Sequence, residues 1–245
     1  MTIRWLLVTL LCWPLLLWQG KRARQRALCL PETLGRRSGM QGSGEPLRLL
    51  ICGDSAAAGV GVGVSQQKYA FSGQLVDLLA RQYQVNWQLA AKTGLDCAGL
   101  NHLLHQLYAH SNAVYRLDLV VVSIGVNDVT ALHSKAEFRQ QIRILLDRLA
   151  TDFTDPQVLF CAIPPIQRFT ALPSPINYWL GLKARMLNQA LTSELHNWPK
   201  AQLVCCNFAL AADMLAADGF HPSESGCKIW AKLVFDAMKF TSDSR

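Results

Sequence analysis

The sequence predicts an α/β fold, a three-layer α/β/α sandwich around a five-stranded parallel sheet. Two observations lead to this prediction. Five short apolar runs alternate with longer segments whose apolar residues recur at helical spacing. Such alternation is typical of βα units, which build a parallel sheet covered on both faces. In addition, 245 residues are ample for one buried core.

The first two predicted strands each lead into a predicted helix. Residues 47–52 form a nearly continuous apolar run, interrupted only by Arg48, and this pattern indicates a buried strand. Residues 67–84 have apolar side chains at helical spacing, residues 85–91 alternate like a strand, and residues 97–110 return to helical spacing. Two βα units are therefore expected here.

The second half of the domain continues the alternation. Residues 117–124 are the strongest strand candidate, with three consecutive valines. The helix predicted for residues 134–153 begins with the capping-box pair Ser134 and Glu137. The remaining predicted elements are the strand 157–163, the helix 176–198, the strand 201–208 and the closing helix 224–240.

The N-terminal segment has the composition of a membrane-associating segment. Residues 5–18 carry no charge, and Lys21, Arg22, Arg24 and Arg26 follow them. Anionic headgroups attract a basic cluster next to an apolar run. We therefore expect membrane association through this run, and the charge bias would place the α/β domain on the cytoplasmic side.

Three segments follow from this reading: a membrane-associating segment at 1–26, a linker rich in Gly and Pro at 27–46 and the α/β domain at 47–245. The apolar run, with Pro14 inside it, is short for a spanning helix and fits a segment that lies in one leaflet. Two alternatives stay open. The run is a cleaved signal peptide of a secreted or periplasmic protein, or it is a helix packed on the domain itself.

The charge distribution argues against a nucleic-acid-binding protein. Of the net charge of +7, residues 1–37 contribute +6, so the rest of the chain is nearly neutral. Eight cysteines are present without a CxxC pair for zinc, and Cys52, Cys161, Cys205 and Cys206 fall in apolar strand candidates. This usage favours free thiols in a reducing compartment. The oligomeric state is not predicted.

Polar residues follow the predicted strands, where parallel α/β sheets bind their ligands. The segments concerned are Gly53-Asp54-Ser55 after the first strand, Gly94 after the second, Gly125-Val126-Asn127-Asp128 after the third, and Asp218-Gly219-Phe220-His221-Pro222 before the last helix. All of them are expected at one edge of the sheet.

This set fits nucleophilic catalysis on an ester. A serine hydroxyl such as that of Ser55 needs an imidazole, here His221, to take its proton, and Asp218 would orient that imidazole. The backbone N–H groups of Ser55 and Gly94 and the amide of Asn127 are the candidate oxyanion donors. Asp54 and Asp128 are expected to support their loops through hydrogen bonds to backbone N–H groups.

The motifs resemble those of the SGNH/GDSL hydrolases. The family's serine, glycine, asparagine and histidine blocks match Ser55 in GDS, Gly94, Asn127 in GxND and His221 in DxxH, across roughly residues 47–240. Ala56 stands where the family name has leucine, and the second block is reduced to Gly94. The resemblance implies a flavodoxin-like strand order and Asp218 as the acid of the triad.

We therefore expect a serine esterase that forms an acyl-enzyme and uses no metal or organic cofactor. Its substrate would be a small-molecule or lipid ester, and its physiological identity is not predicted. Alternatives with the same residues are an acyltransferase and a carbohydrate O-deacetylase, and a binding module with a remnant site is the non-enzymatic alternative.

Two further segments bear on the site. The loop after the fourth strand is apolar with one cation, so Arg168 and Phe169 are candidate substrate-binding residues. The glycines at 59, 61 and 63 do not match a dinucleotide-binding motif. His102 and His105 lack further metal-binding partners, so no zinc site is predicted.

Overall fold

The fold is built on one six-stranded sheet in the order β1-β3-β2-β4-β5-β6. We describe a computed structural model of the chain, which covers residues 3–63, 67–108, 115–205 and 212–242. The strands are β1 (Ser38–Gln41), β2 (Glu45–Gly53), β3 (Tyr83–Ala91), β4 (Leu119–Ser123), β5 (Gln157–Cys161) and β6 (Ala201–Val204). Strands β2 to β6 are parallel, and their order is the flavodoxin-like one that the resemblance implied.

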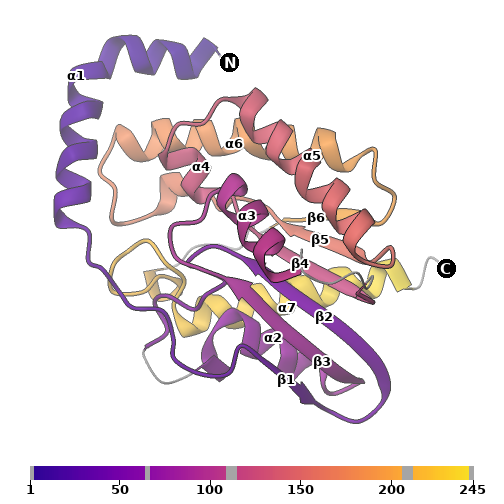
Figure 1. Cartoon of the computed structure of the whole chain (residues 1–245). Helices are drawn as coiled ribbons and strands as arrows, with labels where there is room; N and C mark the ends of the chain where they lie inside the picture. The colour runs from indigo at the N-terminus through magenta and orange to yellow at the C-terminus, as the bar shows by residue number, and fades with distance from the viewer. Residues whose placement is uncertain (1–2, 64–66, 109–114, 206–211, 243–245) are drawn as a thin grey trace.

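Two layers of helices cover the sheet (Figure 1). One layer holds α3 (Cys97–Tyr108), α5 (Lys135–Asp152) and α6 (Ile176–Leu195), and the other holds α2 (Phe71–Leu79) and α7 (Glu224–Ser242). Strand β4 is buried on both faces, which explains why its sequence does not alternate between apolar and polar residues. Val120 and Val122 pack in the core under the first helix layer, and Val121 packs in the core under the second. The predicted three-layer sandwich is confirmed.

Some predicted boundaries differ from the observed ones. The helix expected at 67–84 is a 3-10 turn, η1 (Gln67–Tyr69), followed by α2, and Tyr83 already pairs with Glu45 in the sheet. Sheet pairing thus overrides the helical spacing at the end of that segment. The capping box on α5 is present, with Ser134 accepting a hydrogen bond from the Glu137 N–H.

The segment expected to be a linker, residues 27–46, is partly built into the sheet. Residues 38–41 form β1, which runs antiparallel to β3, and β2 begins at Glu45 rather than at residue 47. The N–H of Leu89 also donates to the carbonyl of Arg37. The linker prediction is therefore wrong for residues 37–46, because pairing with the edge of β3 satisfies their backbone groups.

The N-terminal segment is a single helix, α1 (Ile3–Arg26), with Pro14 inside it. Figure 1 shows that it bends into two arms, which agrees with the missing N–H of a proline in the helix interior. One stripe packs against α6, where Trp5 stacks on Trp179 with ring centroids 5.4 Å apart and Leu16 is buried. By length and composition alone, α1 could cross a membrane, but a signal sequence near the N-terminus would meet the same criteria.

Candidate active site

The carboxyl ends of β2, β3 and β4 are aligned at one edge of the sheet, and this alignment sets the position of Ser55. Gly53 at the end of β2 pairs with both Ala91 of β3 and Ser123 of β4. A Cβ atom on Gly53 would lie 2.0 Å from the Ser123 carbonyl oxygen, so only glycine permits this close approach. The Asp54 N–H then donates to the same carbonyl at 3.1 Å, and Ser55 follows at the sheet edge.

The loop before α7 brings an acid and an imidazole to the same point. Asp218 Oδ1 accepts hydrogen bonds from the N–H groups of Phe220 and His221, at 2.9 and 3.0 Å. Its other oxygen, Oδ2, lies 2.5 Å from His221 Nδ1. His221 Nε2 lies 2.9 Å from Ser55 Oγ, although 166 residues separate the two in the chain. The structure thus brings Ser55, His221 and Asp218 into one hydrogen-bonded chain.

The hydrogen bonds of this chain favour the ionised form of Asp218. Burial acts to raise the pKa of Asp218, but hydrogen bonds from the His221 ring and from the Phe220 and His221 N–H groups bring it below its ordinary value. A carboxylate accepts and cannot donate, so His221 Nδ1 carries the ring proton and Nε2 is free to accept one. Ser55 Oγ–H is the donor that faces Nε2.

The three candidate oxyanion donors are the N–H groups of Ser55 and Gly94 and the Asn127 amide, and Gly94 and Asn127 line the same groove as His221. In the described part of the chain, the N–H groups of Ser55 and Gly94 have no hydrogen-bond partner. Gly94 has φ +84°, and no atom lies within 4 Å of the place where its Cβ would be. Asn127 Nδ2 donates one hydrogen to the Leu95 carbonyl at 2.7 Å, which fixes the amide and leaves its second hydrogen available.

Asn127 is presented by a short helix that the sequence did not predict, α4 (Val126–Thr130). Its N-cap, Gly125, has φ +116°, and a Cβ there would lie 2.7 Å from the Ile163 side chain. The backbone angle therefore favours glycine, and a larger residue would also displace the Ile163 side chain. This turn leads the chain from β4 directly into α4, which carries Asn127 into the groove that His221 also lines.

Two buried acids support these loops, as the sequence suggested. Asp54 Oδ1 accepts from the Ala56 N–H at 3.1 Å, and burial raises the pKa of Asp54 to about 7. Asp128 Oδ2 accepts from the Cys97 N–H at 3.1 Å, and its Oδ1 lies 3.2 Å from His133 Nδ1. Burial also raises the pKa of Asp128, against these two hydrogen bonds. Asp128 thereby ties α4 to the start of α3.

Two spaces of different size adjoin His221. A small apolar pocket of about 70 Å³ lies against Ser55 and His221 and is lined by side chains that include Ile163, Phe169 and Trp230. A wide groove, which we call the α1 groove, has a volume of about 1500 Å³. Its lining includes residues 16–30, Gly94, Asn127, residues 170–173 and His221. Only this groove has room for a substrate with both an acyl chain and a headgroup.

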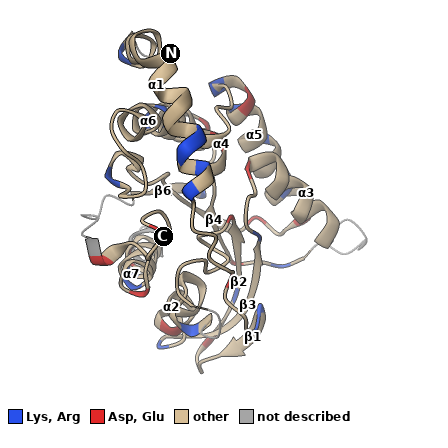
Figure 2. Ribbon diagram, turned by 90° about the vertical axis from the view of Figure 1, so that its left-hand side faces the viewer, with Lys and Arg blue, Asp and Glu red and all other residues tan. Residues whose placement is uncertain are grey.

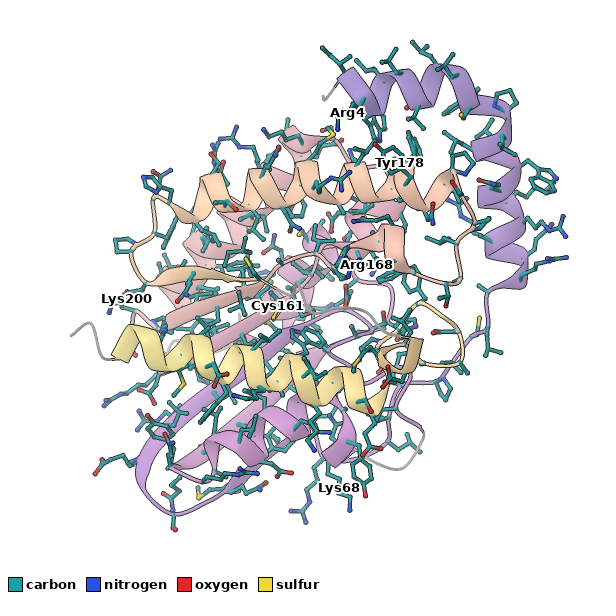
Figure 3. The ribbon with its side chains drawn as sticks, turned by 180° about the vertical axis from the view of Figure 1, so that it is seen from behind. Arg4, Lys68, Cys161, Arg168, Tyr178 and Lys200 are labelled. Atoms are coloured by element: carbon teal, nitrogen blue, oxygen red, sulfur yellow. The ribbon has the colours of Figure 1, made fainter. Side chains whose placement is uncertain are left out.

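Of the two candidate substrate-binding residues, the structure brings one to the site. Phe169 is buried, lines the small pocket and packs edge-on against Phe220 at 4.9 Å between ring centroids. Arg168 is exposed on the 3-10 turn η2 (Ile166–Arg168) and lines neither space (Figure 3). The prediction for Arg168 is therefore wrong, because consecutive residues of a tight turn point in different directions.

Sequence reasoning also missed part of the groove wall. The basic end of α1 and residues 27–30 line the same groove as Asn127 and His221. The sequence assigned these residues to membrane association and a linker, with packing of the helix on the domain as an alternative. No local pattern revealed this, because it depends on how α1 docks on α6. Within the described residues, no group of three or more His, Cys, Asp or Glu side chains is placed to hold a metal ion.

Comparison with known proteins identifies the family of this chain. The family model described as "GDSL-like Lipase/Acylhydrolase family" matches residues 51–229, most of the chain. The chain belongs to this family. The family that the motifs predicted is thus confirmed, and with it a hydrolase-type α/β domain.

Two relatives of this GDSL-family chain are named as esterases. An acetylxylan esterase of Xylanibacter ruminicola is 24% identical over 218 residues, which cover 80% of this chain and 44% of the relative. A GDSL-like esterase of Mycobacterium tuberculosis is 27% identical over 202 residues, covering 79% of this chain and 62% of the relative. The chain therefore spans less than two thirds of either relative. A solved structure of the psychrotrophic esterase EstA from Pseudoalteromonas sp. has a TM-score of 0.61 at 18% identity, covers 80% of this chain and 98% of EstA, and supports the fold.

Proposed function

We propose that this protein is a serine esterase that hydrolyses carboxylic esters through an acyl-enzyme formed on Ser55. The observation that carries the proposal is the hydrogen-bonded chain from Ser55 Oγ to His221 Nε2 and from His221 Nδ1 to Asp218 Oδ2. A serine hydroxyl is a weak nucleophile unless a base takes its proton, and this chain supplies the base together with the group that orients it.

In the first half of the reaction, Ser55 Oγ attacks the ester carbonyl carbon while His221 Nε2 takes its proton. The carbonyl oxygen becomes negative in the tetrahedral intermediate and faces the N–H groups of Ser55 and Gly94 and the Asn127 amide. Asp218 stabilises the resulting imidazolium. The intermediate collapses when the ester C–O bond breaks and His221 returns the proton to the leaving alcohol, which leaves an acyl group on Ser55.

In the second half, water takes the place of the alcohol. His221 Nε2 removes a proton from the water as its oxygen attacks the acyl carbon, and the same donors stabilise the second oxyanion. The C–O bond to Ser55 then breaks, His221 protonates Oγ, and the carboxylic acid leaves. The same residues would support transfer to an alcohol in place of water, so acyl transfer is tested by adding alcohol acceptors.

Carbohydrate deacetylation is the second candidate, and two observations favour it. The small apolar pocket at Ser55 has a volume of only about 70 Å³, which suits a short acyl group. One relative is named an acetylxylan esterase, although the chain covers less than half of it. Hydrolysis rates on p-nitrophenyl esters from acetate to palmitate, together with acetate release from acetylated xylan, separate this candidate from a long-chain esterase.

We also propose that α1 associates with a membrane, with the catalytic domain facing the cytoplasm. The basic residues at its C-terminal end and its exposed apolar face support membrane association. A secreted or periplasmic protein released by signal cleavage is the alternative. Fractionation of the full chain, with N-terminal sequencing of the mature protein, distinguishes the two: loss of residues 1–26 would favour secretion.

A further inference from the structure

Helix α1 is docked beside the site by specific polar contacts. Gln19 is 6% exposed, and both ends of its amide are engaged: Nε2 donates to the Ser174 carbonyl at 2.7 Å, and Oε1 accepts from the Ile176 N–H at 3.1 Å. Trp179 Nε1 donates to Thr9 Oγ1 at 2.7 Å. A buried amide without partners is costly, so these bonds hold α1 in one position on α6.

This docking makes the C-terminal arm of α1 a wall of the α1 groove. In Figure 2, the Lys and Arg positions, coloured blue on the ribbon, gather on this arm. They are Lys21, Arg22, Arg24 and Arg26, and all four line the groove that also contains Asn127 and His221. We call these four residues the basic arm. Cations at a helix C-terminus are favoured by the helix dipole, but their position along the groove is a separate fact that the dipole does not explain.

The basic arm is not neutralised by neighbouring acids. In the described part of the chain, none of its four residues forms an ion pair. Two acids line the groove, Asp96 and Asp218. Asp218 is engaged by His221, and Asp96 accepts from the Gly99 N–H at 2.8 Å and lies 3.8 Å from His133. The α1 groove therefore has excess positive charge available to a ligand.

The exposed apolar side chains of α1 indicate where that ligand comes from. Leu10 and Leu11 are 77% and 80% exposed, and Trp13, Leu17 and Trp18 are also exposed. A continuous apolar surface with tryptophans and an adjacent basic cluster is typical of a segment at the membrane interface. Trp13, Leu17 and Trp18 also line the α1 groove, so the groove borders the surface that would meet the bilayer.

We propose that the α1 groove binds an anionic lipid ester from the membrane, with a phosphate on the basic arm and the acyl chain on the groove's apolar side chains. Phosphate suits this site because arginine and lysine bind it through charge-assisted hydrogen bonds. The inference rests on the proposed function, in which Ser55 attacks the ester. It assigns to α1 a role in substrate selection in addition to membrane attachment.

The test compares a charged and a neutral ester of equal chain length on the full chain. The substrates are hexanoylglycerol phosphate and hexanoylglycerol, both soluble, so membrane partitioning does not contribute. The double variant Arg24→Gln/Arg26→Gln should lower kcat/KM for the phosphate ester about 10-fold, mainly through KM, since each exposed ion pair contributes modestly. Hydrolysis of the neutral ester should change less than about twofold.

The matched control is Arg4→Gln, which removes a cation from the same helix outside the groove lining. It should leave the preference for the phosphate ester unchanged. Equal losses on both substrates in the double variant would show that the basic arm does not recognise the phosphate and would overturn the proposal. The same loss with Arg4→Gln would also overturn it, because any cation of α1 would then attract the anionic substrate equally well. Gln19→Leu should also weaken the preference while the protein still sediments with phosphatidylglycerol vesicles. An unchanged preference in a folded variant would contradict the role of the docked helix.

A binding measurement separates this inference from the proposed function. Hexyl phosphate, which has no carboxylic ester, should bind the full chain, and the double variant should weaken that binding about 10-fold. If wild type hydrolyses no ester but binds hexyl phosphate in this way, the esterase proposal fails and the anion site stands. If ester hydrolysis is present and hexyl phosphate binding is unaffected by the double variant, the anion site is wrong.

Discussion

The Asn127 amide offers the sharpest test of the proposed oxyanion site. Asn127→Ala removes a donor that acts mainly on charge developing in the transition state. The loss of one such donor commonly lowers kcat by about 10²–10³-fold, equivalent to about 3–4 kcal/mol. KM should change much less, because the ground-state ester carbonyl carries little charge. Steady-state kinetics on p-nitrophenyl butyrate measure both constants.

The structure also predicts a smaller cost to stability. Asn127 Nδ2 donates to the Leu95 carbonyl at 2.7 Å, so the substitution removes a net contribution of about 1 kcal/mol. Thermal unfolding therefore shows whether lost activity reflects lost fold. Asn86→Ala, at an exposed position on β3, is the matched control and should leave kcat unchanged. A variant of Asn127 that raises KM while kcat holds would show that this residue binds substrate in the ground state, and the oxyanion argument would be refuted.

Four further results are expected. Asp218→Asn should lower kcat by roughly 10²–10⁴-fold with little change in fold, since an amide can hold His221 in the wrong tautomer; activity within about threefold of wild type would contradict its role. Activity should be lost as the pH is lowered, because an imidazole base must be unprotonated to accept the Ser55 proton, whereas the lowered pKa of Asp218 keeps that carboxylate ionised; a flat profile from about pH 5 to 9 would argue against an imidazole base. Burial raises the pKa of Asp54 from 3.8 to about 7. Between these two pH values the folded state binds more protons than the unfolded state, so the free energy of unfolding falls as the pH rises. Asp54→Asn should remove about 2 kcal/mol of this fall between pH 5 and 8, as measured by urea unfolding, and an identical pH dependence in the variant would contradict the argument. A variant lacking residues 1–27 should leave the membrane fraction that holds the full chain, and a full chain that is soluble at low salt would refute membrane attachment.

Much of the fold follows from local sequence patterns because burial on both faces leaves a clear signature. The valines at 120–122 indicated a central strand, and they do pack into two different cores. The edge strand β1 was missed because residues 38–41 are mostly exposed and carry no apolar pattern. Its pairing depends on the free edge of β3, which no local window of sequence reveals.

The site residues could be predicted from the sequence because the carboxyl ends of parallel strands meet at one edge of the sheet. Ser55, Gly94 and Asn127 all follow strands whose last residues are paired or adjacent, so their proximity could be expected from order alone. The contribution of α1 to the wall of the α1 groove could not be predicted in this way. The position of α1 depends on contacts such as that of Gln19 with Ser174, across 155 residues, and only the tertiary structure shows them.

The central claim is that Ser55 is the nucleophile, and active-site labelling tests it most directly. A fluorophosphonate probe should modify the wild-type protein once, and mass spectrometry of the digested protein should place the modification on Ser55. Ser55→Ala should abolish both the labelling and more than 99% of ester hydrolysis, whereas Ser43→Ala, at an exposed turn position, should keep both. Labelling of a different residue, or hydrolysis by Ser55→Ala above about a hundredth of the wild-type rate, would contradict the account.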